Sequence, residues 1–268
     1  MDEKGFLIGL LKKVRRIVPT KALREGLVKG MAGDGSREFI TLIAAISASG
    51  RRHSPAIVYA SESGNLQESW LEDFKTTSTR VLVAASTNVW SNDALALDWL
   101  KKFDKETTVA NGLGSRLLIL DGHGSHVTEE FINYALVNRI YLVVLPPHAT
   151  HMLQPLDVSI FSPLSTSYDA QLNQHILDTG GLPNIGKDKF CPLFIAAWQN
   201  AVTEENLLSA FTKTGIWPTD PYRIIDPLRE AMNHALHNDM AMLPETPTTF
   251  VEVRRYIRDI KTTPPSHE

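Results

Sequence analysis

The feature that most constrains the fold is a pair of short, continuous apolar runs, RLLIL at 116–120 and IYLVVL at 140–145. Runs of this length without polar alternation are typical of strands that are buried on both faces of a sheet. The segment between them, 127–138, has the periodicity of a helix. Strand, helix and strand in this order predict a right-handed βαβ unit with parallel strands, and hence an α/β fold.

Other patterns predict elements that extend this α/β architecture. EFITLIAAIS at 38–47 and AIVYA at 56–60 flank a turn that contains glycine, which indicates a β-hairpin. RVLVAA at 80–85 predicts a third strand. Periodicity and end signals predict helices at 92–103, from Gln154 and Pro155 to about His175, at 190–202 and at 205–215, the last closed by Gly215.

Composition excludes several classes of protein. The net charge of -3 gives no global attraction to nucleic acid, so any DNA contact must come from local patches. No apolar stretch is long enough to span a bilayer, and the N-terminus has acids before bases, the wrong order for a secretory signal. The single cysteine, Cys191, excludes an internal disulfide and is expected to be a buried, inert thiol. The basic cluster at 12–16 is interpreted as solvated surface, with a nuclear-import patch as the alternative.

Asp121 is the most informative acid in the chain. It directly follows a predicted buried strand, where the chain turns through Gly122 and Gly124. Ligand sites of open α/β sheets collect at the carboxyl ends of strands. Because an Asp before Gly is also a common turn residue, this position alone supports a functional site and a structural turn equally.

Asp157 lies in QPLDVSIF, in the first turn of a predicted helix, where a carboxylate also favours the helix dipole. The strand at 140–145 returns beside the first strand, and the PPHATHM loop then turns back to the same edge. Asp121 and Asp157 are therefore expected to converge. Two convergent carboxylates suit hard divalent cations such as Mg²⁺ or Mn²⁺, which support phosphoryl transfer, and a third carboxylate is normally needed.

The segment that contains both acids resembles the core of the DDE superfamily endonucleases, in the pogo-like branch of the Tc/mariner transposases. DGHGSH at 121–126 is similar to the family motif in which an Asp ends a strand, and LQPLD at 153–157 is similar to the motif of the third acid. MDEKGF at 1–6 matches the weaker motif of the first acid. AFTKTGIWPTDP at 210–221 resembles the close of the family domain, so the similarity covers roughly 1–225.

This resemblance implies an RNase H-like mixed sheet flanked by helices. It implies that Asp2, Asp121 and Asp157 are catalytic residues and that all three bind metal, holding two ions of Mg²⁺ or Mn²⁺. It also implies an endonuclease and DNA strand transferase that nicks transposon ends and joins the liberated 3′-hydroxyl to target DNA. The implied partner is DNA, with no membrane and no small-molecule substrate. A homodimer is compatible with this activity, and the implied compartment is the nucleus.

The first acid of an RNase H-like fold lies on a central strand, with residues of that strand before it. Because only Met1 precedes Asp2, we expect the first strand to be largely missing and Asp2 to be poorly held. Family members also carry helix-turn-helix modules upstream. The expected organisation is a catalytic domain at 1–178, a helical continuation at 179–239 and a peripheral tail at 240–268.

Three functions stay open at this point. The first is catalysis by the three Asp residues. The second is a catalytically inactive, transposase-derived protein that binds nucleic acid or another partner, which loss of the first strand would favour. The third is a zinc hydrolase, because imidazole binds zinc and four histidines flank the acids: His123, His126, His148 and His151. Their loops lack the helical HExxH scaffold, so a role in shaping loops or positioning phosphate is favoured.

Overall fold

The computed structural model describes residues 1–8, 38–87, 93–111, 114–122, 128–178 and 186–241. The basic cluster at 12–16, the histidines His123 and His126, and the tail after Ala241 lie outside these ranges. Contacts divide the chain into two compact units, Met1–Arg223 and Ile224–Glu268. Helix α8 (Tyr222–Ala241) begins at the end of the first unit and belongs mostly to the second. The domain boundaries placed after residues 178 and 239 stay predictions.

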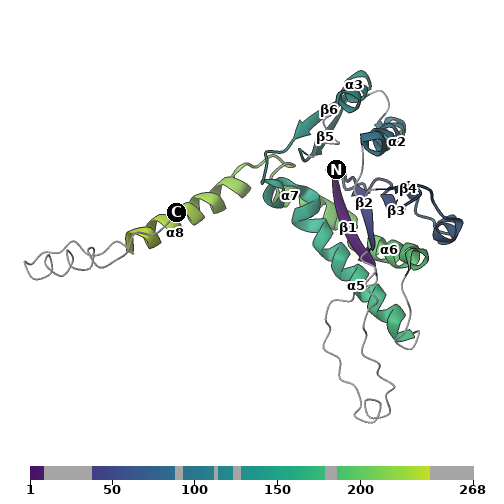
Figure 1. Cartoon of the computed structure of the whole chain (residues 1–268). Coiled ribbons are helices and arrows are strands. Elements are labelled where there is room, and N and C mark those ends of the chain that lie inside the picture. The colour runs from purple at the N-terminus through teal and green to yellow at the C-terminus, as the bar shows by residue number, and fades with distance from the viewer. Residues whose placement is uncertain (9–37, 88–92, 112–113, 123–127, 179–185, 242–268) are drawn as a thin grey trace, which may run out of the picture. The chain divides into compact units, whose positions relative to one another are not determined.

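Four strands of the first unit form one sheet in the order β1-β2-β3-β4 (Figure 1). β1 (Asp2–Ile8), β2 (Glu38–Ala44) and β3 (Ala56–Ala60) are antiparallel neighbours, and β4 (Leu82–Ser86) runs parallel to β3. The predicted hairpin and the third strand are confirmed. Most side chains of β2 and β3 are buried, as expected for near-continuous apolar runs at the centre of a covered sheet.

Strand β1 corrects the prediction that the first strand is largely missing. Its seven residues pair with β2 along their whole length, from Asp2 opposite Ala44 to Ile8 opposite Glu38. The strand extends downstream of Asp2, and burial of Phe6 and Ile8 anchors it in the core. Asp2 is only 8% exposed, so the sheet holds this acid and the expected fraying does not occur.

A second pair of strands confirms the predicted βαβ unit. β5 (Arg116–Leu120) and β6 (Ile140–Val144) are parallel, and helix α3 (Glu129–Val137) connects them. Helix α3 begins after Thr128, whose hydroxyl accepts a hydrogen bond from the backbone N–H of Phe131. This cap satisfies one of the amides that the first helical turn leaves unpaired.

The two sheets meet where strand β1 begins. The N-terminal amine of Met1 donates a hydrogen bond of 2.8 Å to the carbonyl oxygen of Ile119 in β5. This bond brings β5 to the start of β1, while β5 and β1 stay in separate sheets. The mixed four-stranded sheet and the parallel pair, with helices on the faces, give the mixed α/β arrangement expected from the sequence.

The helices follow the predicted positions. The remaining elements of the first unit are η1 (Glu68–Trp70), η2 (Glu72–Lys75), α2 (Asp93–Asn111), α4 (Thr150–Leu153), the π-helix η4 (Leu156–Ile160), α5 (Phe161–Asp178), α6 (Lys187–Ala201) and α7 (Glu204–Lys213). Helix α2 runs further than predicted. Gly215, with a φ of +66°, closes α7 as expected, because a Cβ there would overlap the carbonyl oxygen of Asp220.

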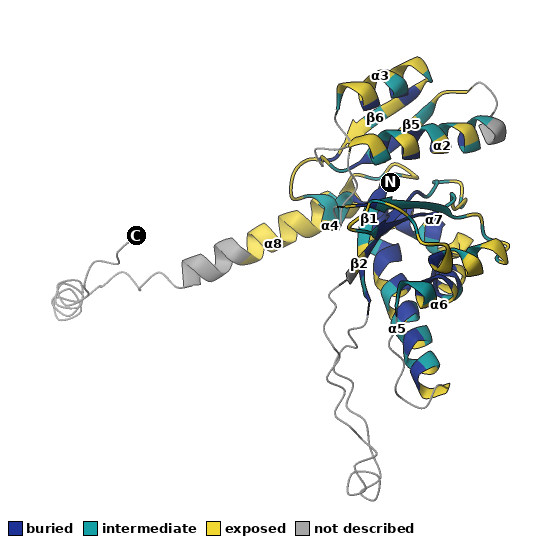
Figure 2. Cartoon of the chain, turned by 45° about the vertical axis from the view of Figure 1, so that its right-hand side comes forward, coloured by how far each residue is buried: buried dark blue, intermediate teal, exposed yellow. Residues whose placement is uncertain are grey.

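Hydrophobic clusters cover both faces of the sheet. One cluster joins Phe6 and Ile8 of β1 with helices α5 and α6, whose buried sides are dark blue in Figure 2. The other joins Met1 with α2, α3 and β5. Successive side chains of a strand alternate between faces, so Asp2 lies on the same face as Phe6, toward α5.

Candidate active site

Asp2 is the first residue of β1 and lies on the strand face that η4 and α5 cover. Its Oδ1 accepts a hydrogen bond of 2.8 Å from the backbone N–H of Glu3. Two residues further along this face, the Nζ of Lys4 lies 5.3 Å from the ring centre of Phe161. Strand β1 therefore presents a buried carboxylate and a cation, next to each other, to the helical layer.

Asp121 lies directly after strand β5 and is partly exposed, so its predicted place at the end of a strand is confirmed. It is two residues beyond Ile119, the residue that accepts the hydrogen bond from Met1. Asp2 directly follows Met1, the donor of this hydrogen bond, on strand β1. Asp121 and Asp2 thus flank the junction between the two sheets.

Asp157 is exposed and lies in η4, which begins after Pro155. Its neighbours Leu156 and Ile160 are fully buried, so the turn that carries the acid is anchored in the core. A π turn spaces its hydrogen bonds one residue wider than an α-helix does. This turn carries Asp157 directly before the long helix α5 begins at Phe161. Single π turns within helices are frequent at functional sites.

The three acids influence one another electrostatically. Burial, with a smaller contribution from the charges of Asp157 and Asp121, raises the pKa of Asp2 to about 7 against the opposing effects of the Glu3 amide and the Met1 amine. Although Asp157 is exposed, partial desolvation by the surrounding protein raises its pKa; the charge of Lys4 opposes this shift and the charge of Asp121 adds to it. The charge of Asp121 thus acts on both other acids, and the charge of Asp157 acts on Asp2.

The chemistry of this donor set fits a hard divalent cation. Carboxylate oxygens are the donors that Mg²⁺ and Mn²⁺ prefer, and mutual repulsion among carboxylates favours a bound cation. Within the part of the chain that the structure describes, no group of three or more His, Cys, Asp or Glu side chains is close enough to hold an ion. The metal-binding and catalytic roles of Asp2, Asp121 and Asp157 stay predictions.

The backbone of Met1 ties the three segments of the site together. Its amine bonds to Ile119, and its carbonyl oxygen accepts a hydrogen bond of 2.8 Å from the Nε2 of Gln154. Gln154 is only 1% exposed and precedes Asp157 by three residues. Burial lowers the pKa of the Met1 amine to about 6, even though the charges of Asp2 and Asp121 act to raise it. Both acids therefore act on this amine.

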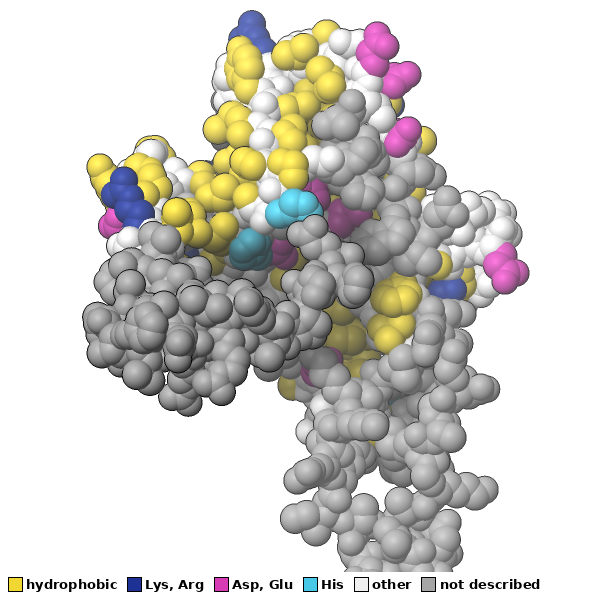
Figure 3. Space-filling view, turned by 60° about the vertical axis from the view of Figure 1, so that its left-hand side comes forward, with side chains coloured by type: hydrophobic (Ala, Val, Ile, Leu, Met, Phe, Trp, Pro, Cys, Tyr) yellow, Lys and Arg dark blue, Asp and Glu magenta, His cyan; other side chains and the backbone are white. Residues whose placement is uncertain are grey.

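Two of the four predicted histidines, His148 and His151, lie in the described part of the chain, and one of them acts on an acid. His151, in helix α4, lowers the pKa of Asp157, and His148 has a φ of +62° in the preceding loop. A non-glycine residue in this region is uncommon and occurs often at functional sites. Figure 3 shows histidine and acidic side chains next to each other on one face, bordered by hydrophobic side chains.

Cys191 is buried, and burial raises its pKa to about 12, so its thiol stays protonated at neutral pH. This confirms the expectation of a buried, inert thiol. Sequence reasoning missed Lys4 and Gln154. A signal existed for Lys4, because strand periodicity puts residues 2 and 4 on one face. Gln154 gave no such signal, because its partner is far away in the sequence.

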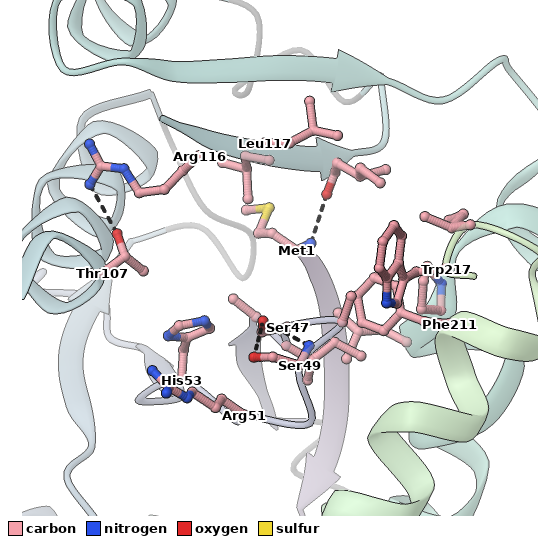
Figure 4. Close-up of a pocket in the computed structure, with 18 of the residues that line it drawn as sticks. Met1, Ser47, Ser49, Arg51, His53, Thr107, Arg116, Leu117, Phe211 and Trp217 are labelled. Atoms are coloured by element: carbon pink, nitrogen blue, oxygen red, sulfur yellow. Dashed lines mark hydrogen bonds between the residues drawn. The ribbon is translucent and has the colours of Figure 1, made fainter. Parts of the chain in front are cut away.

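A cavity of about 670 Å³ lies on the other side of the junction (Figure 4). Met1 lies between its two halves: Arg116 and Thr107 on one side, Phe211 and Trp217 on the other. None of the three carboxylates lines this cavity. This cavity is therefore separate from the candidate carboxylate site.

Comparison with known proteins identifies the family. Residues 36–211 match the family described as DDE superfamily endonuclease. The matched segment contains Asp121 and Asp157 and begins downstream of Asp2. The place of Asp2 in the site therefore depends on the motif at 1–6 and on the geometry of strand β1.

Curated relatives share parts of the sequence. The chain is 34% identical over 227 residues to the MFS-type transporter clz9 of Cochliobolus lunatus, which covers 85% of this chain and 24% of that protein. It is 28% identical over 134 residues to the Pogo transposable element with KRAB domain of Homo sapiens, which covers 47% of this chain and 22% of that protein. The chain spans about a quarter of the length of these relatives. None of its described helices has the length and hydropathy needed to cross a bilayer.

Two solved structures are similar to the chain. One is the Mos1 transposase paired-end complex with left transposon end, with 13% identity, a TM-score of 0.38, and coverage of 81% of this chain and 54% of that chain. The other is a pre-cleavage Mos1 transpososome, with 10% identity, a TM-score of 0.37, and coverage of 80% and 54%.

Proposed function

The chain belongs to the DDE superfamily endonucleases as a pogo-like, transposase-type member, and from this premise we propose that it is the core of a DNA endonuclease and strand transferase. In this proposal Asp2, Asp121 and Asp157 hold two divalent metal ions, Mg²⁺ or Mn²⁺. The observation that supports it most is the pair of hydrogen bonds by which Met1 links the segments of all three acids. In addition, the charges of Asp157 and Asp121 raise the pKa of Asp2, and the charge of Asp121 raises the pKa of Asp157.

The proposed chemistry is phosphoryl transfer. When bound, two divalent ions activate the attacking oxygen and stabilise the leaving oxygen. In nicking, the oxygen of water bonds to phosphorus, the bond to the 3′ oxygen breaks, and a 3′-hydroxyl and a 5′-phosphate result, with the proton of water ending on the 3′ oxygen. In strand transfer, the 3′-hydroxyl takes the place of water as the nucleophile.

The chain's own side chains have distinct tasks in this proposal. Strand β1 fixes Asp2 in the sheet, and the buried residues of η4 fix the turn that carries Asp157. Lys4 partly neutralises Asp157 and supplies a local positive charge. Such a local charge matters because the net charge of -3 gives no general attraction to DNA.

DNA as the substrate, the nucleus as the compartment and a homodimer as the assembly are parts of the same proposal. The family supports DNA as the substrate, and the relatives named as pogo transposable elements support action on transposon ends. These relatives are much longer than this chain, so DNA recognition by the whole protein can involve segments that the chain does not contain.

A nicking assay tests the proposal. Purified chain is incubated with supercoiled plasmid and Mg²⁺ or Mn²⁺, and conversion to the relaxed circle is measured. We expect metal-dependent nicking that is lost in Asp121→Asn and in Asp157→Asn. Asp98→Asn, which changes an exposed acid paired with Lys101, is the matched control and should nick like the parent.

Two outcomes would count against this activity. Equal nicking by the parent and by Asp121→Asn would show that the assigned carboxylates are not catalytic. Binding of DNA without nicking at any metal concentration would favour the alternative of a catalytically inactive, transposase-derived binding protein.

A further inference from the structure

Gln154 makes a buried hydrogen bond that no element of secondary structure requires. Its Nε2 donates to the carbonyl oxygen of Met1 over 2.8 Å, across 153 positions of sequence. The side chain is 1% exposed. A buried amide costs free energy unless it is hydrogen-bonded, so this contact fixes both the Gln154 side chain and the peptide unit that it holds.

That peptide unit leads directly into Asp2. The Met1 carbonyl belongs to the peptide bond that joins Met1 to Asp2, so the bond from Gln154 restrains the backbone at the acid itself. On its other side, the amine of Met1 donates to Ile119, two residues before Asp121. One backbone unit is therefore tied to the segments of two different acids.

Gln154 is equally well fixed to the third acid. Its carbonyl oxygen accepts a hydrogen bond of 3.0 Å from the N–H of Val158, the residue after Asp157. Its own N–H donates to the carbonyl oxygen of Thr150 over 2.9 Å. The backbone of Gln154 is thus part of the turn that carries Asp157, while its side chain reaches strand β1.

We propose that Gln154 is a positioning residue that sets the separation of Asp2 and Asp157 for metal binding. This inference rests on the proposed function of the three acids. Side chains that hold metal ligands in place without touching the metal are commonly worth about 10- to 100-fold in metal affinity. A neutral amide suits the task, since a carboxylate here would add a fourth negative charge beside the acids and could not donate to the Met1 carbonyl when ionised.

The test compares Gln154→Met with Asn206→Leu. Met keeps the unbranched shape of Gln and removes the amide donor. Asn206 is the matched control, because its Nδ2 also donates to a backbone carbonyl, that of Ala201, over 2.8 Å. Mn²⁺ affinity is measured by calorimetry on each full chain, with urea unfolding in parallel. In the nicking assay, the Mn²⁺ concentration at half-maximal rate is determined separately from the rate at saturating Mn²⁺.

We expect Gln154→Met to bind Mn²⁺ about 10- to 100-fold more weakly than the parent, with nicking restored at saturating Mn²⁺. Asn206→Leu should lose stability and keep the Mn²⁺ affinity of the parent. Unchanged affinity in a folded Gln154→Met chain would overturn the inference while leaving the proposed function intact. Absence of Mn²⁺ binding by the parent would instead reject the proposed function, and the inference with it.

A variant that fails to fold is also informative. Gln154→Asn keeps the amide and shortens its reach by one methylene, so we expect it to fold and to bind Mn²⁺ more weakly than the parent. If both Gln154 variants unfold under conditions in which Asn206→Leu is folded, the bond serves stability alone and the positioning role is rejected.

Discussion

Among single residues, Arg116 joins three elements of the structure through its guanidinium. Its Nη1 lies 2.5 Å from the Oδ1 of Asp104 in helix α2, and its Nη2 donates to the carbonyl oxygen of Asn138 after helix α3. Tyr134 donates to the other carboxylate oxygen of Asp104 over 3.1 Å. The Arg116 and Asp104 side chains are 9% and 14% exposed, so solvent screens this pair little.

We predict that Arg116→Ala lowers the free energy of unfolding by about 3–5 kcal/mol, because it leaves the Asp104 carboxylate buried without its cation. Lys101→Ala is the control: its ion pair with Asp98 is exposed, and such pairs contribute about 0–1 kcal/mol. Urea unfolding of both variants measures the difference. Similar losses in the two variants would show that the Arg116 cluster is no stronger than a surface pair.

Asp104 also predicts a dependence of stability on pH. Burial would raise its pKa, but hydrogen bonds from Arg116, Thr108 and Tyr134 together lower it below the ordinary value. A lowered pKa means that the folded state binds the proton more weakly than the unfolded state. The stabilisation is therefore complete above the unfolded pKa of about 3.9 and is lost as pH falls through the folded value.

Urea unfolding of the parent and of Asp104→Asn tests this pH dependence. The measurements run from pH 3 to pH 7 in steps on the order of one pH unit. We expect the stability advantage of the parent to be constant near neutral pH and to shrink below about pH 4. An advantage that stays constant down to pH 3, or that grows on acidification, would contradict the assignment.

The sequence predicts the acids of the site better than the contacts around them. Asp121 and Asp157 could be found because each stands at a recognisable strand end or helix start. Strand periodicity could have placed Lys4 on the face of Asp2, but the contact of Lys4 with Phe161 and that of Gln154 with Met1 join residues far apart in the sequence. Contacts of this kind depend on how strands and helices pack, and local periodicity carries no information about that packing.

At the scale of elements, strand β1 is where the sequence was most misleading. DEKGFLI begins with three charged residues and contains a glycine, so its composition does not indicate a buried strand. Pairing with β2 and burial of Phe6 decide its conformation. The βαβ unit was predictable, in contrast, because its strands are apolar throughout and its helix has its own cap at Thr128.

We predict that Phe6→Ala lowers the free energy of unfolding by about 3–5 kcal/mol. The ring of Phe6 makes edge contacts with Tyr168, Phe190 and Phe194, at centre distances of 5.1 to 5.9 Å. Phe39→Ala on β2 is the control, because that ring is 38% exposed and its loss leaves a smaller cavity. A Phe6→Ala chain as stable as Phe39→Ala would mean that β1 is not an integral strand.

The π-helix η4 had no signal in the sequence. The helix from Pro155 was predicted, but the wider turn at Leu156–Ile160 was not. A single π turn changes the register of a helix without changing its composition. The structure shows the π turn directly at Leu156–Ile160.

At the scale of the whole molecule, the site lies where two sheets and two hydrophobic clusters meet. The clusters place helices on both faces of the sheet, and the bond from Met1 to Ile119 joins its antiparallel and parallel parts. The α/β class and most elements follow from apolar runs in the sequence. The way in which the two sheets join could not be predicted from the sequence, because it depends on a contact between Met1 and Ile119, which are 118 positions apart.

The central claim is that Asp2, Asp121 and Asp157 form one site for divalent cations. Calorimetric titration of the purified chain with Mn²⁺, repeated with Asp2→Asn, Asp121→Asn and Asp157→Asn, tests it most directly. We predict that the parent binds, that each of the three variants binds at least about 10-fold more weakly, and that the control Asp98→Asn binds like the parent. Parent-like affinity in any of the three variants would remove that acid from the site, and absence of binding by the parent would contradict the account as a whole.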